Sequence, residues 1–291
     1  MSISILLHAN IQYAEIPFSE WNNVFEKSYY PTINYLLNKE IKFGLNITGY
    51  TIERLPKKII ELIRDGIDSE LTELTGCSYT HAILPLLPLD NVYRQVKKDM
   101  EVKEKVFNVK PKVFWPPELA YDPLLPGVLD LLDYTHVFVD DKALYYTDIN
   151  DYFKKYESPI KHLHMAEKGK WPVIINYLIG LRELKDFLNK VIEGKVIVGV
   201  REIIGIPVWV PLNIATILGV GKFPLMNPRK LCKWFSKLDN VMIYATDIEF
   251  FGYRDIAGKL PDVARPVELL NCLDKDIVFP SELPLNGEKR F

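Results

Sequence analysis

The sequence SILLHANIQY, residues 4–13, passes abruptly from aliphatic side chains to His, Asn, Gln and Tyr. A short aliphatic run of this kind predicts a buried β-strand, and the polar residues after it predict a loop at the carboxyl end of that strand. The run is short and has no basic leader, which argues against a signal peptide. We therefore expect residues 4–7 to form the first buried strand of the fold.

Short apolar runs recur along most of the chain and alternate with amphipathic segments. Pro56–Arg64, Asp90–Val109 and Leu181–Ile192 each place apolar residues along one helical face. Strands that alternate with helices are typical of a parallel sheet with crossover helices. The expected strands are Ser4–Leu7, Phe43–Ile47, Lys112–Trp115, His136–Val139, Val196–Val200 and Val241–Ala245. The pattern predicts a single repeated β/α fold without an internal domain boundary.

Composition and charge narrow the class of protein. With 291 residues, 48% of them hydrophobic, the chain is long enough to bury the core of one large barrel. The formal net charge of -2, from 36 basic and 38 acidic residues, gives no global reason to expect nucleic acid or an anionic membrane as a partner. Pro207 and Pro211 disfavour a membrane helix in the longest uncharged stretch, Ile203–Gly221. We expect strand and loop structure there.

The cysteines, and the motifs that the sequence does not contain, bear on the cellular compartment of the protein and on its need for a cofactor. Cys77, Cys232 and Cys272 are widely separated and show no paired metal-ligand spacing. They predict reduced thiols, a cytoplasmic protein and no metal. The sequence contains no dinucleotide fingerprint, phosphate-loop lysine motif or Gly-x-Ser-x-Gly elbow, so we expect no cofactor.

Four polar clusters fall where a predicted strand gives way to a loop, the edge at which barrels build their sites. The first contains His8, which on its own could equally be a core histidine. The second, residues 73–81, sets Glu73 and His81 before an apolar run, and a capped loop is its plain structural explanation. These two clusters become informative only together with the next two.

The third cluster, VFWPPELAYDP at residues 113–123, surrounds Glu118 with Trp115, Tyr121 and rigid prolines. Aromatic faces stack on the CH surfaces of sugars, and a stiff loop preorganises a carboxylate. The fourth, YATDIEFFGY at residues 244–253, ends a strand with Asp247 and Glu249, which strand alternation would point to the same side. Taken together, the clusters favour a sugar site with two working carboxylates.

The last three clusters resemble, in order, motifs of glycoside hydrolase family 57, which contains archaeal and bacterial α-amylase-type enzymes and 4-α-glucanotransferases. WPPE at residues 115–118 resembles the Trp-x-Pro-Glu motif, whose glutamate is the nucleophile. DIEFFG at residues 247–252 resembles the Asp-x-Glu-x-Phe-Gly motif, whose aspartate is the acid/base. Residues 73–85 are similar to the second motif, and His8 matches the first motif's histidine, although the common His-Gln-Pro sequence is absent.

The resemblance runs from His8 to about Tyr253 and implies an α/β fold, an incomplete (β/α)7 TIM-like barrel. We expect residues 1–260 to form the catalytic barrel and residues 261–291 to form a C-terminal tail packed on it. Members commonly continue into a helical domain that closes the cleft, whereas a short tail follows here. The resemblance therefore implies a short member that lacks most of that domain.

The implied activity is that of a retaining glycoside hydrolase or transglycosidase on α-linked oligo- or polysaccharide. Glu118 would be the nucleophile and Asp247 the general acid/base, with carboxyl groups roughly 5–5.5 Å apart. A homo-oligomer would be one way to supply the missing cover over the cleft. The expected substrate-binding residues are His8, Glu73, His81, Trp115, Tyr121, Glu249 and Phe251.

Two other functions stay open. The chain could be a carbohydrate-binding homologue of the same barrel that is catalytically weak or inactive, which the missing closure favours. It could also be a metal-dependent deacetylase or mannosidase of related barrel type, for which His8, His162 and His164 would have to converge with an Asp on a divalent ion.

Overall fold

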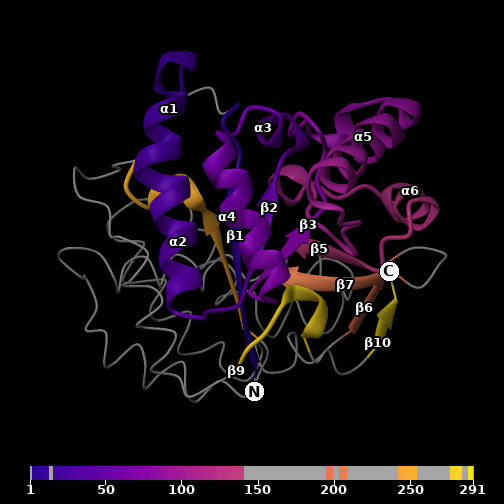
Figure 1. Ribbon diagram of the computed structural model, residues 1–291. Coiled ribbons are helices and arrows are strands. Elements are labelled where there is room, and N and C mark those ends of the chain that lie inside the picture. The colour runs from indigo at the N-terminus through magenta and orange to yellow at the C-terminus, as the bar shows by residue number, and fades with distance from the viewer. Residues whose placement is uncertain are drawn as a thin grey trace, which may run out of the picture.

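The computed structural model describes residues 2–12, 16–140, 195–198, 203–208, 242–253, 276–283 and 288–290 (Figure 1). Its strands form two hydrogen-bonded series, β3-β2-β1-β8, with β9 also on β1, and β10-β6-β7-β5-β4. The strands are β1 Ser2–Ala9, β2 Phe43–Ile47, β3 Thr72–Thr75, β4 Val113–Phe114, β5 His136–Asp140, β6 Lys195–Val198, β7 Ile203–Val208, β8 Met242–Asp247, β9 Asp276–Ile277 and β10 Glu288–Arg290.

A short contact just beyond β3 links the two series. Gly76 forms a parallel bridge with Phe114 of β4. The N–H of Gly76 donates to the carbonyl of Val113 at 2.8 Å, and the N–H of Trp115 donates to the carbonyl of Gly76 at 2.8 Å. The order β8-β1-β2-β3-β4-β5-β7 is therefore continuous and parallel throughout. Among the described strands, the pairing of β6 with β7 is the only antiparallel one, and β10 pairs in parallel with β6. The prediction of an α/β fold with a parallel sheet is confirmed.

The described helices lie on one face of this sheet (Figure 1). The predicted helices at residues 56–64 and 90–109 are α4, Lys57–Asp68, and α5, Leu89–Phe107. The shorter α3, Gly49–Ile52, and α6, Leu125–Leu131, were not predicted. The predicted helix at residues 181–192 lies outside the described residues, as do Cys232, Cys272, His162 and His164.

The first helical region contains a π turn. Residues 21–38 are helical throughout, as α1 Trp21–Val24, a π-helical turn η2 Phe25–Tyr29 and α2 Tyr30–Asn38. Pro31 has no N–H to donate to the carbonyl of Lys27, so the regular i to i−4 pattern cannot continue there. Instead, the N–H of Tyr30 donates to the carbonyl of Phe25, five residues back.

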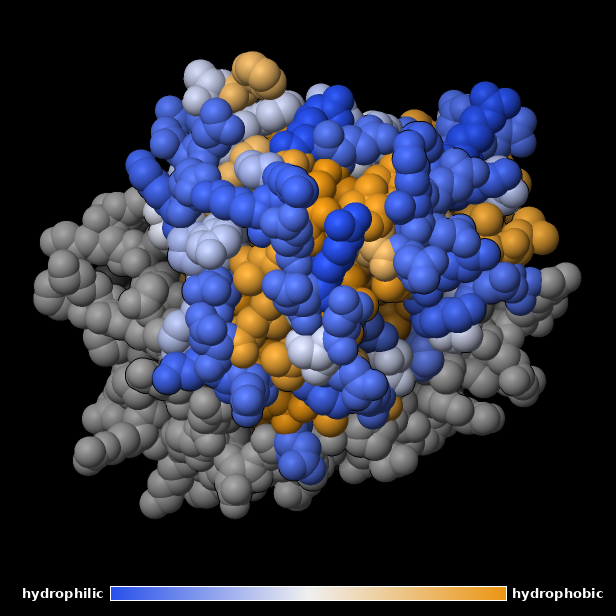
Figure 2. Space-filling model, viewed as in Figure 1, coloured by the Kyte–Doolittle hydropathy of each residue, from blue (hydrophilic) through white to orange (hydrophobic). Residues whose placement is uncertain are grey.

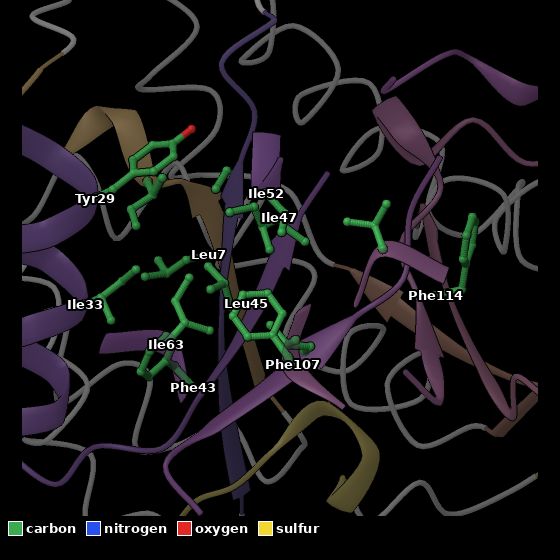
Figure 3. Close-up of a cluster of buried hydrophobic side chains, with 14 of the residues drawn as sticks. Leu7, Tyr29, Ile33, Phe43, Leu45, Ile47, Ile52, Ile63, Phe107 and Phe114 are labelled. Carbon is green, nitrogen blue, oxygen red and sulfur yellow. The ribbon is translucent and has the colours of Figure 1, made fainter. Parts of the chain in front are cut away.

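Strand alternation divides the apolar residues into two cores. Ile3, Ile5 and Leu7 of β1 pack toward the helices, and Figure 3 shows Ile33 and Ile63 on the helices pointing toward Leu7. The opposite face has a smaller cluster of its own, made by Leu6, Val113, Phe138, Ile243, Ala245 and Leu283. The period of two along β1 thus fixes which residues face the helices and which lie on the opposite side of the sheet, called the interior face below.

Residues 276–283 lie on the side of the sheet opposite the helices. The N–H of Val278 donates to the carbonyl of Ile3 at 2.8 Å, beside the pairing of β9 with β1 (Figure 1). A Cβ on Gly44 would lie 2.8 Å from Pro280, so β2 and the turn η6, Pro280–Glu282, approach closely. Residues 276–283 therefore fill the end of the sheet opposite the carboxyl ends of its strands.

The helical face is mainly hydrophilic. Figure 2 shows charged and polar side chains over most of it, with apolar residues visible in the seams between them. Among the residues that the structure describes, no helix is both long and apolar enough to cross a bilayer.

Gly76→Ala tests the join between the two strand series. A Cβ at Gly76 would lie 2.2 Å from the hydroxyl oxygen of Tyr134, whose side chain is buried and cannot swing away. We expect the free energy of unfolding to fall by roughly 1–3 kcal/mol, measured by urea denaturation. The control is Gly127→Ala in α6, where nothing lies within 4 Å and a gain of roughly 0.5–1 kcal/mol is expected. Equal effects of the two substitutions would contradict this account of the join.

Candidate active site

Four polar residues lie side by side at the carboxyl ends of four neighbouring strands. Asp247 of β8 is paired in register with His8 of β1, His8 with Asn46 of β2, and Asn46 with Thr75 of β3. Neighbouring residues in parallel register lie on the same side of the sheet. The row therefore presents Asp247, His8, Asn46 and Thr75 toward one region above the interior face.

The hydrogen bonds of Asn46 determine which ring nitrogen of His8 carries the proton. The side-chain N–H groups of Asn46 donate to Thr75 Oγ1 at 2.8 Å and to the carbonyl of Gly76 at 3.1 Å. Its Oδ1 lies 2.6 Å from His8 Nδ1 and can only accept, so the proton of a neutral His8 sits on Nδ1. Burial lowers the pKa of His8 to about 4, with a further contribution from the charge of Lys103. His8 is therefore a neutral imidazole at physiological pH.

His81 stacks on His8 from the loop that follows β3. The two ring centroids are 4.6 Å apart, with 33° between the ring planes. His81 has a left-handed φ of 56°, and its N–H donates to the carbonyl of Ser78 at 3.1 Å. Burial and the neighbouring His8 lower the pKa of His81 to about 3, against the opposing effect of Asp247. Two neutral imidazoles and a carboxyl group thus meet at one place.

Glu249 is a buried acid that lies close to Asp247. Its Oε1 accepts from the hydroxyl of Tyr29 at 2.5 Å and from the N–H of Asn10 at 3.1 Å. Burial raises the pKa of Glu249 to about 8, with a contribution from Asp247. The expected alternation of Asp247 and Glu249 along one strand is wrong, because β8 ends at Asp247 and the 3-10 turn η5, Ile248–Phe250, follows.

The π turn of the first helical region packs against η5. The hydroxyl of Ser28 donates to the carbonyl of Ile248 at 2.6 Å, next to the contact between Tyr29 and Glu249. Gly252 has φ +89°, and a Cβ there would lie 2.1 Å from the carbonyl oxygen of Lys27. The glycine of the DIEFFG segment is thus required by its backbone conformation and by the close approach of the helix.

Glu118 lies on a strained turn directly after β4. It is exposed and has φ 57°, inside the 3-10 turn η4, Pro117–Leu119, and Leu119 also has a left-handed φ of 53°. Left-handed backbone costs a residue with a Cβ roughly 1–2 kcal/mol. The N–H of Leu119 donates to the carbonyl of Pro116 at 2.9 Å, which fixes the turn. The glutamate is therefore presented outward by a stiff and unfavourable local conformation.

Two aromatic residues flank this turn. Trp115 packs against Phe138, with ring centroids 4.9 Å apart, and is partly exposed. Tyr121 is half-buried, and burial raises its pKa to about 12 with a contribution from Asp122. Both remain partly accessible beside Glu118, as a stacking role would require.

The remaining predicted site residues lie deeper. Glu73 Oε2 accepts from the N–H of Ser281 at 3.1 Å, and burial raises the pKa of Glu73. Phe251 is 4% exposed and belongs to the helix-side core, and Glu249 is fully buried. In the structure these three residues contact protein groups, and their contact with a substrate stays a prediction.

Sequence reasoning missed Asn46 and Tyr29. Asn46 had a usable signal, because it is a polar residue inside the otherwise apolar strand FGLNI. Tyr29 had none, because the π turn changes the helical phase that would have placed it. Within the described ranges, no three His, Cys, Asp or Glu side chains are placed to hold a metal ion.

Glu249→Gln tests the protonated state of the buried acid. Because the folded-state pKa of about 8 lies above the usual 4.5, the wild type loses stability as pH rises from about 4.5 through 8. Gln cannot lose a proton, so the variant has no such loss. Its free energy of unfolding should therefore rise relative to that of the wild type as the pH rises, by a few kcal/mol at about pH 9. Urea denaturation between pH 5 and 9 measures this.

The control for that experiment is Glu70→Gln, at an exposed turn residue. Its free energy of unfolding should stay at a nearly constant offset from the wild type across the same pH range. A constant offset for Glu249→Gln as well would show that Glu249 is ionised in the folded protein.

Comparisons with known proteins bear on the family. The sequence pattern of glycosyl hydrolase family 57 matches residues 6–283. A segment of 74 residues is 39% identical to a 1,4-alpha-glucan branching enzyme of Thermococcus kodakarensis and covers 24% of this chain and 11% of that enzyme.

Two solved structures are similar across the chain. The 4-alpha-glucanotransferase from Thermococcus litoralis has a TM-score of 0.68 at 15% identity, over 100% of this chain and 42% of that one. The branching enzyme from Pyrococcus horikoshii has a TM-score of 0.60 at 13% identity, over 99% of this chain and 71% of that one. The chain thus spans less than half of the glucanotransferase, and identities this low show the fold alone. Because the family pattern covers nearly the whole chain, the chain belongs to glycosyl hydrolase family 57.

Proposed function

We propose that this chain is a retaining glycosidase or transglycosidase that acts on α-linked oligo- or polysaccharide, with Glu118 as nucleophile and Asp247 as general acid/base. The observation that carries the proposal is the in-register row that sets Asp247 beside His8, with His81 stacked above. Neutral imidazoles can hydrogen-bond sugar hydroxyls, and they place no cation beside Asp247 that would oppose its protonation.

The proposal requires the sheet to curl. Glu118 follows β4 and Asp247 ends β8, which are four strand positions apart in the order β8-β1-β2-β3-β4. At about 4.8 Å per strand, four positions span roughly 19 Å along a flat sheet. A retaining mechanism needs the carboxyl groups roughly 5–5.5 Å apart. An incomplete (β/α)7 barrel, with these two edges facing each other across a pocket, reconciles the two lengths and is part of the proposal.

The mechanism then follows as a double displacement. The carboxylate of Glu118 attacks the anomeric carbon while Asp247 gives its proton to the departing glycosidic oxygen, and a covalent glycosyl ester forms. Asp247, now a carboxylate, takes a proton from water or from an acceptor hydroxyl, whose oxygen displaces Glu118. Configuration at the anomeric carbon is retained. Trp115 and Tyr121 would stack on the sugar beside the nucleophile.

One observation favours a second candidate function. Glu118 is exposed, whereas a covalent glycosyl intermediate is best protected where water is excluded. A carbohydrate-binding homologue with weak or no catalysis would not need to exclude water from Glu118. Sugar binding with no turnover of any α-glycoside by the wild type would favour this reading over the enzyme.

Glu118→Gln and Asp247→Asn test the two assigned roles. Each substitution keeps the shape of the side chain but removes the nucleophilic carboxylate or the transferable proton, so kcat should fall on the order of 10³-fold or more. The assay incubates the protein with α-linked oligosaccharides and aryl α-glycosides and separates the products by size. Glu70→Gln, at an exposed left-handed turn with φ 56°, is the matched control and should retain full activity. Substantial residual turnover in Glu118→Gln would refute the nucleophile.

Glu118→Gly tests whether the strained turn serves function. Glycine adopts a φ of 57° without a Cβ penalty, so thermal stability should hold or rise slightly, by up to about 1 kcal/mol, while activity is lost. Glu70→Gly relieves the same kind of strain at φ 56° and should keep its activity. A large loss of stability in Glu118→Gly alone would mean that the glutamate side chain is needed for folding.

A further inference from the structure

Two fully buried charges on α5 are not among the residues assigned above. Asp99 and Lys103, four residues apart, are each 0% exposed and form an ion pair between Asp99 Oδ2 and Lys103 Nζ. Removing two charges from water is costly, and apolar residues often replace a buried pair without loss of stability. The pair therefore suggests a requirement other than stability.

Asp99 also bonds the backbone beyond two strands. Its Oδ1 accepts from the N–H of Gly49 at 2.7 Å, and its Oδ2 accepts from the N–H of Cys77 at 3.0 Å. Gly49 begins α3 shortly after β2, and Cys77 follows the bridging residue Gly76 after β3. A single carboxylate thus ties α5 to the segments that leave the carboxyl ends of both strands.

Those two segments carry the groups that arrange the stacked imidazoles. Asn46, which bonds His8, lies three residues before Gly49, and His81 lies four residues after Cys77. The N–H of Tyr50 donates to the carbonyl of Tyr79 at 3.0 Å, which joins the two segments directly. A shift of either segment would therefore move one imidazole relative to the other.

Lys103 has a second connection to the same place. Among the described residues, those that act on His8 include Asn46 from β2, Lys103 from α5 and, through the ring stack, His81 with Asp247 nearby. Burial is the larger cause of the lowered pKa of His8, and the positive charge of Lys103 acts in the same direction. Loss of that charge would therefore raise the pKa of His8 above about 4.

We infer that the Asp99–Lys103 pair positions the candidate active site: Asp99 holds the segments after β2 and β3 so that His81 stacks on His8, and Lys103 holds Asp99. The inference rests on the proposed function for its catalytic consequence. Neither residue is assigned any contact with substrate, and each acts through the backbone that it fixes.

The double variant Asp99→Asn/Lys103→Met removes both charges at nearly constant volume. Its Asn can still accept from the N–H of Gly49, but its amide N–H then faces the N–H of Cys77, so one of the two ties is lost. Single substitutions are avoided because each would leave one buried charge without its partner. The matched control is Glu101→Gln/Lys97→Met, the same chemical change in an exposed i,i+4 pair on the same helix.

We expect the double variant to fold with a wild-type circular dichroism spectrum, while kcat/KM falls at least tenfold. Imidazole NMR should show the titration midpoint of His8 raised, because the charge of Lys103 lowers the pKa of His8. The control should match the wild type in all three measurements. A folded double variant with wild-type kcat/KM and a wild-type His8 midpoint would overturn the inference. The pair would then only hold α5 in place.

Amide hydrogen exchange in the wild type provides a test that needs neither a variant nor activity. If Asp99 holds both segments, the amides of Gly49 and Cys77 should exchange with the same opening free energy as the central amides of α5. Exchange of either amide at least 100-fold faster than those of α5 would overturn the inference, also where the double variant does not fold. Absence of turnover in the wild type, with coupled exchange and a shifted His8 midpoint, would refute the proposed function alone.

Discussion

The site depends first on the register of β1 between β2 and β8. A slip of one residue would send Leu7 to the interior face and His8 to the helices, because side chains alternate along a strand. The helix-side core opposes that slip, since Ile3, Ile5 and Leu7 are all buried in it together with residues of α2 and α4. Packing on one face of β1 therefore sets which residue stands between Asn46 and Asp247 on the other face.

Burial explains the protonation states that follow from this placement. An ionised group taken out of water favours its neutral form unless a partner compensates it. His8 and His81 are accordingly neutral above a pKa of about 4 and about 3, and Glu249 keeps its proton up to about pH 8. Asp99 has such partners, because Lys103 and two backbone N–H groups contact its carboxylate. The described neighbours of Asp247 thus include two neutral imidazoles and a protonated Glu249 near neutral pH.

The sequence predicted the elements whose burial is visible in their composition. Aliphatic runs located β1, β2, β5 and β8, and helical periodicity located α4 and α5. It missed β3 because Thr72 and Glu73 give that strand no apolar run, although the strand is paired along its whole length with β2. The family motifs supplied Glu118 and Asp247, which no periodicity could have identified.

The missed contacts share a physical cause. Asp99 and Lys103 lie in a lysine-rich helix whose charges look like a solvent face, but both are buried, and Asp99 bonds the segments that follow β2 and β3. Tyr29 reaches Glu249 because Pro31 breaks the regular helix, which no fixed period of 3.6 residues can represent. Polar interiors of this kind arise from segments far apart in the chain, so a local pattern does not contain them.

The turn at Glu118 connects stability to function. Folding does not require a glutamate at φ 57°, because glycine fits that conformation at lower local cost, and the neighbouring prolines stiffen the turn whichever residue occupies it. Glu70 has the same strain at φ 56° in an ordinary exposed turn, so what sets Glu118 apart is its place after β4 between Trp115 and Tyr121. Because Asp247 lies four strands away, both carboxylates could reach one sugar only if the sheet curls as we propose.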